Sequence, residues 1–152
     1  MESKKHLQVS ALENGTVIDH IPQGVVQKVL KILGLEDCTE PIYLGANLES
    51  KKMGRKGIIK VANRYFANEE INKIALIAPT ATIIEIRNYE IIKKQKVCIP
   101  DEIVNILKCP NPKCITNYEK VETRFYVIDK EDIKLRCHYC EKVIKKDNLI
   151  YL

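Results

Sequence analysis

The spacing of apolar residues changes several times along the first hundred residues, and each change predicts a new element. Apolar and polar residues alternate over 6–12 and 16–21, which predicts two strands joined by an Asn-Gly turn at 13–15. From about Gln23 the apolar residues recur at intervals of three and four, which predicts a helix that ends at Gly34. The chain therefore begins with two strands and a helix.

The same two kinds of spacing then repeat. Alternation over 42–48 and 57–63 predicts two more strands, with the polar stretch 50–56 as the loop between them. Asn68 is a good N-cap for a second helix, because two glutamates follow it in the first turn, where the helix dipole favours negative charge. Pro79 is expected to end that element.

Two closing strands are predicted over 82–87 and 90–94. The resulting order contains β-α-β-β-α-β, the ferredoxin-like arrangement, extended by an added strand at each end. Its antiparallel sheet packs both helices on one face and leaves the other face open for a ligand or a partner. We therefore predict an α+β fold, with an N-terminal ferredoxin-like domain over 1–100 and a second, small all-β domain over 101–152.

Four cysteines in this last third of the chain form two short pairs. The first pair reads C-P-N-P-K-C and the second C-H-Y-C, with twenty-two residues between them. Two such loops bring in the four soft ligands of a tetrahedral structural metal, and Zn²⁺ is commoner than iron in these sites. The expected ligands are Cys109, Cys114, Cys137 and Cys140. Four thiolates leave no open position for a catalytic water, so the site is expected to be structural. His138 lies within the second pair and is expected to point away from it.

About fifty residues bury little apolar surface, so the C-terminal unit is expected to fold only with its metal. The alternative interpretation of the cysteines is two disulfides. The N-terminus has no apolar segment of the kind found in signal peptides, which favours a cytoplasmic protein and therefore metal over disulfides. Cys38 and Cys98 remain outside this scheme and are expected to be ordinary, semi-buried thiols.

Composition narrows the possible functions. The net charge is +5, with 15 basic and 11 acidic residues in the first hundred positions. Aromatic residues make up only 6% of the chain, and no basic stripe contains interleaved aromatics, so a zinc-ribbon nucleic-acid adaptor is the alternative rather than the main interpretation. A rubredoxin-like carrier or thiol redox enzyme is a second alternative. No apolar stretch approaches the roughly 20 residues of a membrane span.

Several local motifs resemble the regulatory chain of aspartate carbamoyltransferase over nearly the full length. They are L-Q-V-S-A-L (7–12), G-T-V-I-D-H-I-P (15–22), M-G-R-K-G-I-I-K (53–60), A-P-T-A-T-I (78–83), N-Y-E-I-I (88–92) and the frame C-P-N-P-K-C…C-H-Y-C-E. The zinc spacing by itself is shared by many ribbons. In a chain that also contains G-T-V-I-D-H-I-P and N-Y-E before the cysteines, this spacing becomes specific to the family.

The resemblance implies a non-catalytic subunit of pyrimidine biosynthesis. Such chains dimerise through the N-terminal domain and hold the catalytic chain through the zinc domain, so that regulatory dimers bridge catalytic trimers. ATP, CTP and sometimes UTP bind the N-terminal domain as allosteric effectors. A ligand of this kind acts because it binds one global state more tightly than the other. Nucleic acid and membrane are not expected partners.

The resemblance also implies a set of effector-binding residues. Apolar residues match the wall beside the base and ribose, Asp19 matches an acceptor for the ribose hydroxyls, and two lysines match the groups that meet the triphosphate. The full set is Val9, Ala11, Leu12, Val17, Asp19, His20, Lys60, Tyr89, Ile91 and Lys94. Two positions depart from the familiar pattern: Ser10 stands where an acidic residue is usual, and Ile84 stands where an asparagine is usual. An isoleucine cannot donate a hydrogen bond to a nucleotide.

Overall fold

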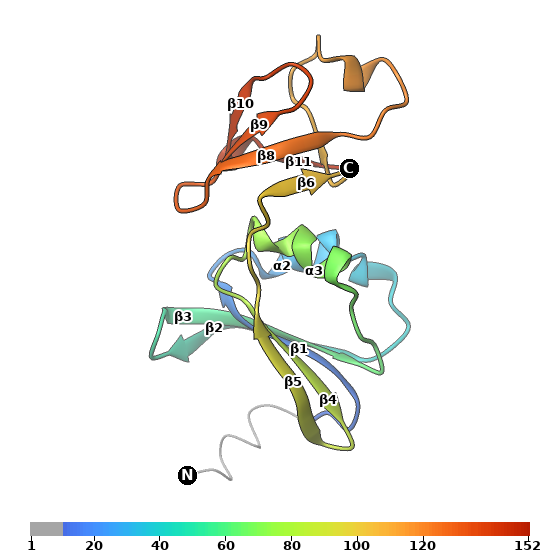
Figure 1. The fold of residues 1–152 in the computed structure, drawn as a ribbon. Helices are drawn as coiled ribbons and strands as arrows, with labels where there is room; N and C mark the ends of the chain where they lie inside the picture. Colours follow the sequence, from blue (N-terminus) through green and yellow to red (C-terminus); the bar gives the residue numbers. More distant parts are fainter. Residues whose placement is uncertain (1–10) are drawn as a thin grey trace. The chain divides into compact units, whose positions relative to one another are not determined.

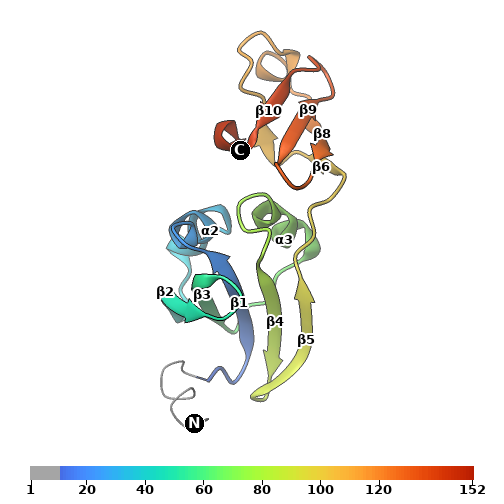
Figure 2. The ribbon, with the colours of Figure 1, turned by 90° about the vertical axis from the view of Figure 1, so that its left-hand side faces the viewer.

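The computed structural model describes residues 11–152, which fall into two compact units that divide between Val97 and Cys98 (Figure 1). The first unit contains an antiparallel sheet with the strand order β2-β3-β1-β4-β5. Both of its helices cover one face of this sheet (Figures 1 and 2). The strands are β1 (Gly15–Pro22), β2 (Ile42–Ser50), β3 (Gly54–Ala62), β4 (Thr82–Arg87) and β5 (Glu90–Lys96), and the helices are α2 (Val26–Ile32) and α3 (Asn68–Ala75). The predicted ferredoxin-like order is confirmed, with β5 as the added edge strand.

The core of this unit lies between the sheet and the helices. Ile18 on β1 is paired with Ile59 on β3 and Ile83 on β4, and all three side chains are almost completely buried. Helix α2 approaches β3 closely at Gly57, where an added Cβ would lie 2.0 Å from a methyl carbon of Val26. The helices therefore cover the face of the sheet to which Ile59 and Gly57 belong, and the alternate residues of β3 belong to the open face.

Several predicted boundaries need correction. The stretch 50–56 is not a loop, because β2 continues to Ser50 and β3 begins at Gly54, so only a tight turn separates them. Helix α3 begins at Asn68 with Ala67 as its N-cap, and the Glu70 carboxylate accepts the Ala67 N–H at 3.3 Å. Glu70 therefore supplies the cap that was expected from Asn68. The predicted strand over 6–12 lies mainly outside the described residues, and 11–12 are not in a strand.

The predicted end of the first helix is confirmed. Gly34 directly follows the C-cap Leu33 and has a φ of 67°, the left-handed conformation that glycine adopts without strain. Its N–H donates to the Lys31 carbonyl at 3.0 Å. Within residues 11–152, no helix has the length and apolar character required to cross a membrane.

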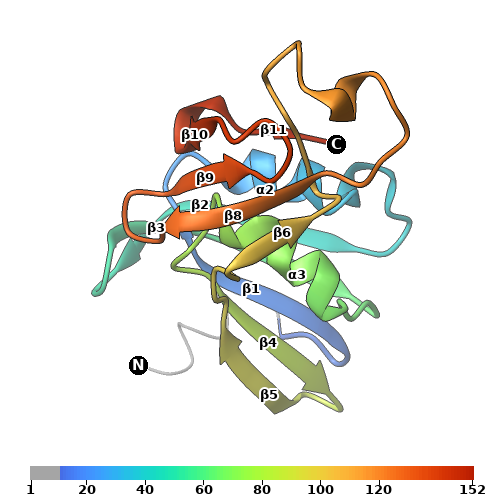
Figure 3. The same cartoon turned by 45° about the horizontal axis from the view of Figure 1, so that its top comes forward.

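The second unit is built from short strands around a small core (Figure 3). Its sheets have the orders β10-β9-β8-β6 and β11-β7. Phe125, Leu135, Ile103 and Leu107 are fully buried between them. The strands are β6 (Glu102–Val104), β7 (Leu107–Lys108), β8 (Arg124–Asp129), β9 (Lys134–Cys137), β10 (Val143–Lys145) and β11 (Ile150–Tyr151). The predicted small all-β unit is thus confirmed, and the whole chain is α+β.

Candidate functional site

The four paired cysteines converge at one point of the second unit. Their sulfur atoms all lie within 4.8 Å of one another, and three of the four residues are buried. Sγ of Cys109 lies 3.7 Å from Sγ of Cys140, and Sγ of Cys114 lies 3.8 Å from Sγ of Cys137. A tetrahedral Zn²⁺ with Zn–S bonds of about 2.3 Å places its sulfur ligands about 3.8 Å apart. A disulfide would require about 2.05 Å. The cluster therefore fits a metal ion and not two disulfides.

Local hydrogen bonds hold the first cysteine pair in place. The Asn117 side-chain amide donates to the carbonyl oxygens of Cys109 (3.1 Å) and Asn111 (2.8 Å), and the Cys114 N–H donates to the same Asn111 carbonyl at 3.0 Å. The short 3-10 helix η2 (Ile115–Asn117) begins directly after Cys114 and supplies this asparagine. Hydrogen bonds within residues 109–117 therefore shape the loop between Cys109 and Cys114, which brings the two sulfurs to the same side.

The second pair is closed by a tight turn. The Cys137 N–H donates to the Lys142 carbonyl, and the Glu141 N–H donates to the Cys137 carbonyl, both at 3.0 Å. Glu141 has a φ of 62°, which turns the chain back after Cys140. His138 is exposed, and its Nδ1 lies 2.7 Å from the Tyr126 hydroxyl, so its ring has a partner outside the sulfur cluster. The expectation that His138 points away is confirmed.

The protonation of the cluster depends on burial. Burial raises the pKa of the Cys109 and Cys137 thiols above their ordinary value. At Cys140 burial acts in the same direction, but hydrogen bonds, first from the Asn111 side chain and then from the Lys142 N–H, outweigh it and bring the pKa to about 7. Buried thiols resist ionisation unless a cation compensates the charge, and a bound Zn²⁺ supplies that charge. The donor set thus fits a thiolate-bound metal.

The other two cysteines do not join this cluster. Cys38 is half-buried, as expected, whereas Cys98 is exposed, so the prediction of a semi-buried thiol is wrong for Cys98. Cys98 is the first residue of the second unit and lies between the strands β5 and β6, outside both.

The open face of the first unit brings together a second group of polar residues. Val17 is paired with Lys60 on β3 and with Ile84 on β4, and Ile84 is paired with Lys94 on β5. Directly paired residues point to the same side of a sheet, so these four side chains form one row across four strands. The row lies on the face opposite the helices, because Lys60 alternates with Ile59. Lys60 is only 7% exposed, whereas Lys94 is exposed.

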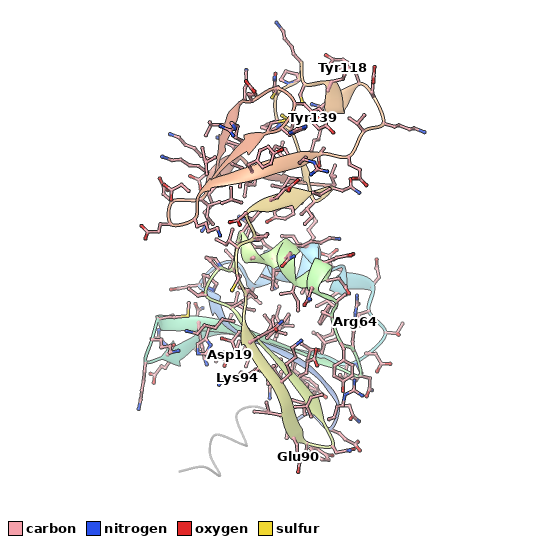
Figure 4. The ribbon with its side chains drawn as sticks, viewed as in Figure 1. Asp19, Arg64, Glu90, Lys94, Tyr118 and Tyr139 are labelled. Atoms are coloured by element: carbon pink, nitrogen blue, oxygen red, sulfur yellow. The ribbon has the colours of Figure 1, made fainter. Side chains whose placement is uncertain are left out.

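Asp19 follows two residues after Val17 and lies on the same face. Its Oδ1 lies 2.8 Å from Nζ of Lys56 and accepts the His20 N–H at 2.7 Å. The β1 strand has a bulge here, and His20 has a φ of 56°. The His20 ring nitrogen Nδ1 lies 3.1 Å from the Thr82 hydroxyl. Figure 4 labels Asp19 and Lys94 in the same region of the sheet.

The charges of this region act on one another. Burial raises the pKa of Asp19, but the Lys56 ion pair and the His20 N–H outweigh it and hold that pKa below its ordinary value. Burial lowers the pKa of His20, Asp19 opposes this, and Lys56, Lys52 and Lys94 lower it further. Burial also lowers the pKa of Lys60, again opposed by Asp19. Residues 11–152 thus contribute four lysines near Asp19 or His20, which is a surface that favours a polyanion.

Family comparisons match both units of this chain. A model of the aspartate carbamoyltransferase regulatory chain, allosteric domain, matches residues 7–98, and a model of the metal binding domain of the same chain matches residues 101–150. The chain belongs to the aspartate carbamoyltransferase regulatory chain family. Proteins named aspartate carbamoyltransferase regulatory chain from Parabacteroides distasonis and Bacteroides fragilis are each 52% identical to it, over 98% and 97% of this chain and 97% of each relative. A chain of the same name from Pyrococcus horikoshii is 53% identical over 95% of this chain and 96% of the relative.

These matches confirm several predictions for this regulatory chain. It is a non-catalytic, regulatory chain in pyrimidine metabolism, with an allosteric domain followed by a metal-binding domain. As a regulatory chain it associates with a catalytic chain. The alternative of a nucleic-acid adaptor is not favoured, because both units match models of a single enzyme regulator.

The structure brings together only part of the effector-binding set that the resemblance implied. Val17, Asp19, His20, Lys60 and Lys94 share one region of the open face of the allosteric domain. Among the other apolar members, Leu12 is buried and Ala11 is exposed, and Val9 lies outside the described residues.

Tyr89 and Ile91 lie further along, at the β4–β5 hairpin. Tyr89 is 66% exposed with a φ of 66°, and its N–H donates to the Glu13 carbonyl at 2.9 Å. Ile91 is paired with Ile86 rather than with the Lys60 row. The Tyr89 N–H is therefore already satisfied within the regulatory chain, and only its other groups are left to meet a base.

Three residues of this region were missed from the sequence. Lys52 and Lys56 were assigned to a solvated loop, and Thr82 was treated only as part of a strand. The register of β3 against β1, which pairs Lys56 with Pro22, brings the Lys56 ammonium to Asp19. The A-P-T-A-T-I motif already contained Thr82, but the spacing of the sequence alone does not reveal that β4 pairs with β1.

Proposed function

We propose that the allosteric domain of this chain, over residues 1–100, binds nucleoside triphosphates on the open face of its sheet. The observation that supports this most strongly is the group of lysines near Asp19 and His20. A triphosphate needs several cations, a ribose needs an acceptor, and a base needs an apolar surface. The four lysines Lys52, Lys56, Lys60 and Lys94 supply the cations, and Asp19 supplies the acceptor. The apolar surface is supplied by Ile84, which lies in the same row of the sheet as Lys60 and Lys94. ATP, CTP and UTP are the proposed effectors.

The test is a calorimetric titration of the zinc-bound chain with ATP, CTP and UTP, each with and without Mg²⁺. Saturable binding of at least one triphosphate, with the corresponding nucleoside binding more weakly, is the expected result. The ranking of the three then shows what Ile84 selects, because this side chain packs against a base but donates no hydrogen bond. Absence of binding to all three would reject the effector site.

We also propose that residues 101–152 form a zinc domain that holds the catalytic chain. The separations of 3.7 and 3.8 Å between two pairs of sulfurs, with all four sulfurs within 4.8 Å of one another, support this. A cavity opens beside Cys109, and exposed apolar side chains line it, with Val143 53% and Ile150 44% exposed. Exposed apolar side chains around a concave surface are typical of an interface. Through this contact, regulatory dimers would bridge catalytic trimers.

A charge placed in that cavity tests this contact. Val143→Asp should prevent complex formation with the catalytic chain in analytical ultracentrifugation, while the zinc content stays at one ion per chain. The matched control is Ile128→Asp on β8, because Ile128 is similarly exposed (48%) but does not line the cavity. Equal assembly of both variants would place the catalytic chain elsewhere on the domain.

Dimerisation is proposed to occur through the allosteric domain. Strand β2 is an edge strand of the sheet, and its Tyr43 and Leu44 are each 47% exposed. The opposite edge strand, β5, instead carries Lys93, Lys94 and Lys96, and lysines on an edge oppose pairing with another strand. Light scattering of the isolated regulatory chain should give a dimer that becomes monomeric in Leu44→Lys. A dimer unaffected by this change would exclude the β2 edge.

A further inference from the structure

The contact between Lys56 and Asp19 has consequences for how the proposed site recognises its ligand. The Lys56 ammonium lies 2.8 Å from Asp19 Oδ1, and both side chains are largely buried, with 20% and 18% exposure. The same oxygen accepts the His20 N–H at 2.7 Å. Asp19 is the residue proposed to accept from the ribose, so in this state its Oδ1 is already occupied by two donors of the chain itself.

We propose that Lys56 is an exchangeable counter-ion that couples phosphate binding to ribose recognition. Without phosphate its ammonium stays on Asp19 and competes with the ribose hydroxyls. A triphosphate draws the ammonium away and thereby frees Asp19 for the ribose. This inference rests on the proposed effector site and adds a means by which that site distinguishes a triphosphate from a nucleoside.

The electrostatics favour such an exchange. A triphosphate carries several negative charges, so it is a stronger partner for an ammonium group than one carboxylate is. Without a cation between them, the phosphates and the Asp19 carboxylate would repel each other. Lysine suits this role because its ammonium has three donors on a flexible stem.

Asp19 is not left as an uncompensated buried charge after the exchange. Its oxygen keeps the His20 N–H, and the buried Lys60 ammonium still acts on it. A ribose hydroxyl then replaces Lys56 as a donor. The cost of leaving a buried carboxylate unpaired is therefore avoided.

The position of Lys56 permits this movement. It lies two residues after Gly54, where the tight turn between β2 and β3 ends. His20, by contrast, is held from two sides, because the Thr80 hydroxyl donates to its carbonyl at 2.7 Å and its ring lies beside the Thr82 hydroxyl. The lysine side chain is thus the adjustable partner of Asp19, and the His20 backbone is the constant one.

The experiment compares a triphosphate with its nucleoside in two variants. Lys56→Met keeps the apolar stem and removes the charge, and Lys51→Met removes a charge from an exposed position of the same hairpin. CTP and cytidine, then ATP and adenosine, are measured by displacement of a fluorescent nucleotide from the zinc-bound full chain. In Lys56→Met the triphosphate affinity should fall about tenfold or more, whereas the nucleoside affinity should rise several-fold. Lys51→Met should change neither by more than about twofold.

The opposite signs are decisive. A simple phosphate ligand would lower triphosphate affinity and leave the nucleoside unchanged, and a merely structural ion pair would lower both. Either result, or a nucleoside that does not bind Lys56→Met even at millimolar concentration, overturns the exchange. If the unmodified chain binds no triphosphate, the proposed effector site itself fails, which is a separate outcome.

Discussion

Lys60 and Lys94 differ in burial, and we therefore predict that they contribute very differently to triphosphate binding. Lys60 is 7% exposed on a central strand, whereas Lys94 is exposed on the edge strand β5. A hydrogen bond from a charged group in a shielded site contributes about 1.5–3 kcal/mol. An exposed ion pair contributes about 0.2–1 kcal/mol, because water and salt screen it. The same substitution should therefore have unequal effects at these two positions.

Methionine is the substitution to use, since it keeps most of the apolar stem. Lys60→Met should weaken triphosphate binding by about 10- to 100-fold, and Lys94→Met by about two- to fivefold. Calorimetric titrations at 0.05 M and 0.5 M salt separate the two further. The Lys94 effect should largely disappear at the higher salt, where the screening length is only a few ångströms, and the Lys60 effect should persist.

Thermal unfolding provides the control for folding. Burial lowers the Lys60 pKa, so the folded state disfavours the charged form, and Lys60→Met should not reduce the melting temperature near pH 7. Equal losses of affinity at both positions, or a larger loss for Lys94→Met that survives high salt, would refute the argument from burial. A larger loss for Lys94→Met would place the phosphates at the sheet edge.

Three further predictions concern metal, protonation and packing. Cys114→Ser should abolish zinc binding, which metal analysis measures, because it removes one of the four sulfurs. The second unit should then unfold while the allosteric domain keeps its own melting transition. A folded second unit without metal would contradict this. Burial and the surrounding Lys56, Lys52 and Lys94 lower the pKa of His20, and a bound triphosphate should raise it. Triphosphate binding near pH 6 should therefore take up a proton, and affinity should rise as the pH falls towards 6, in comparison with His20→Gln. Calorimetry in buffers of different ionisation enthalpy measures this uptake, and equal uptake by both proteins would exclude His20. Gly57→Ala should destabilise the allosteric domain by about 1–3 kcal/mol in denaturant unfolding, because its Cβ would lie 2.0 Å from a Val26 methyl carbon. Gly45→Ala should cost less, because its nearest contacts, with Ile58 and Leu48, are at 2.8 and 2.9 Å.

The spacing of apolar residues predicted the elements correctly where the apolar positions are also the buried ones. The end of the first helix at Gly34 and the strand Thr82–Arg87 were predicted correctly, whereas the helix begins at Val26 rather than at about Gln23. Apolar spacing and a glycine in the left-handed conformation are local properties. The turn between β2 and β3 was misjudged, since Gly54, Arg55 and Lys56 are polar residues held in a strand by pairing with β2. Edge and open-face positions do not need apolar side chains, so their pattern resembles a loop.

The metal cluster and the open-face site differ in how much the sequence could reveal. For the cysteines, each pair is close in the chain, so the sequence by itself singled out the four residues whose sulfurs the structure brings together. The ion pair of Asp19 with Lys56 joins residues 37 positions apart, and only the register of β1 against β3, shifted by the bulge at His20, brings them together. Spacing along the chain determines a group of side chains when its members lie within one short loop, as each cysteine pair does. Contacts between strands depend on pairing and bulges, and those are decided by the packing of the whole sheet.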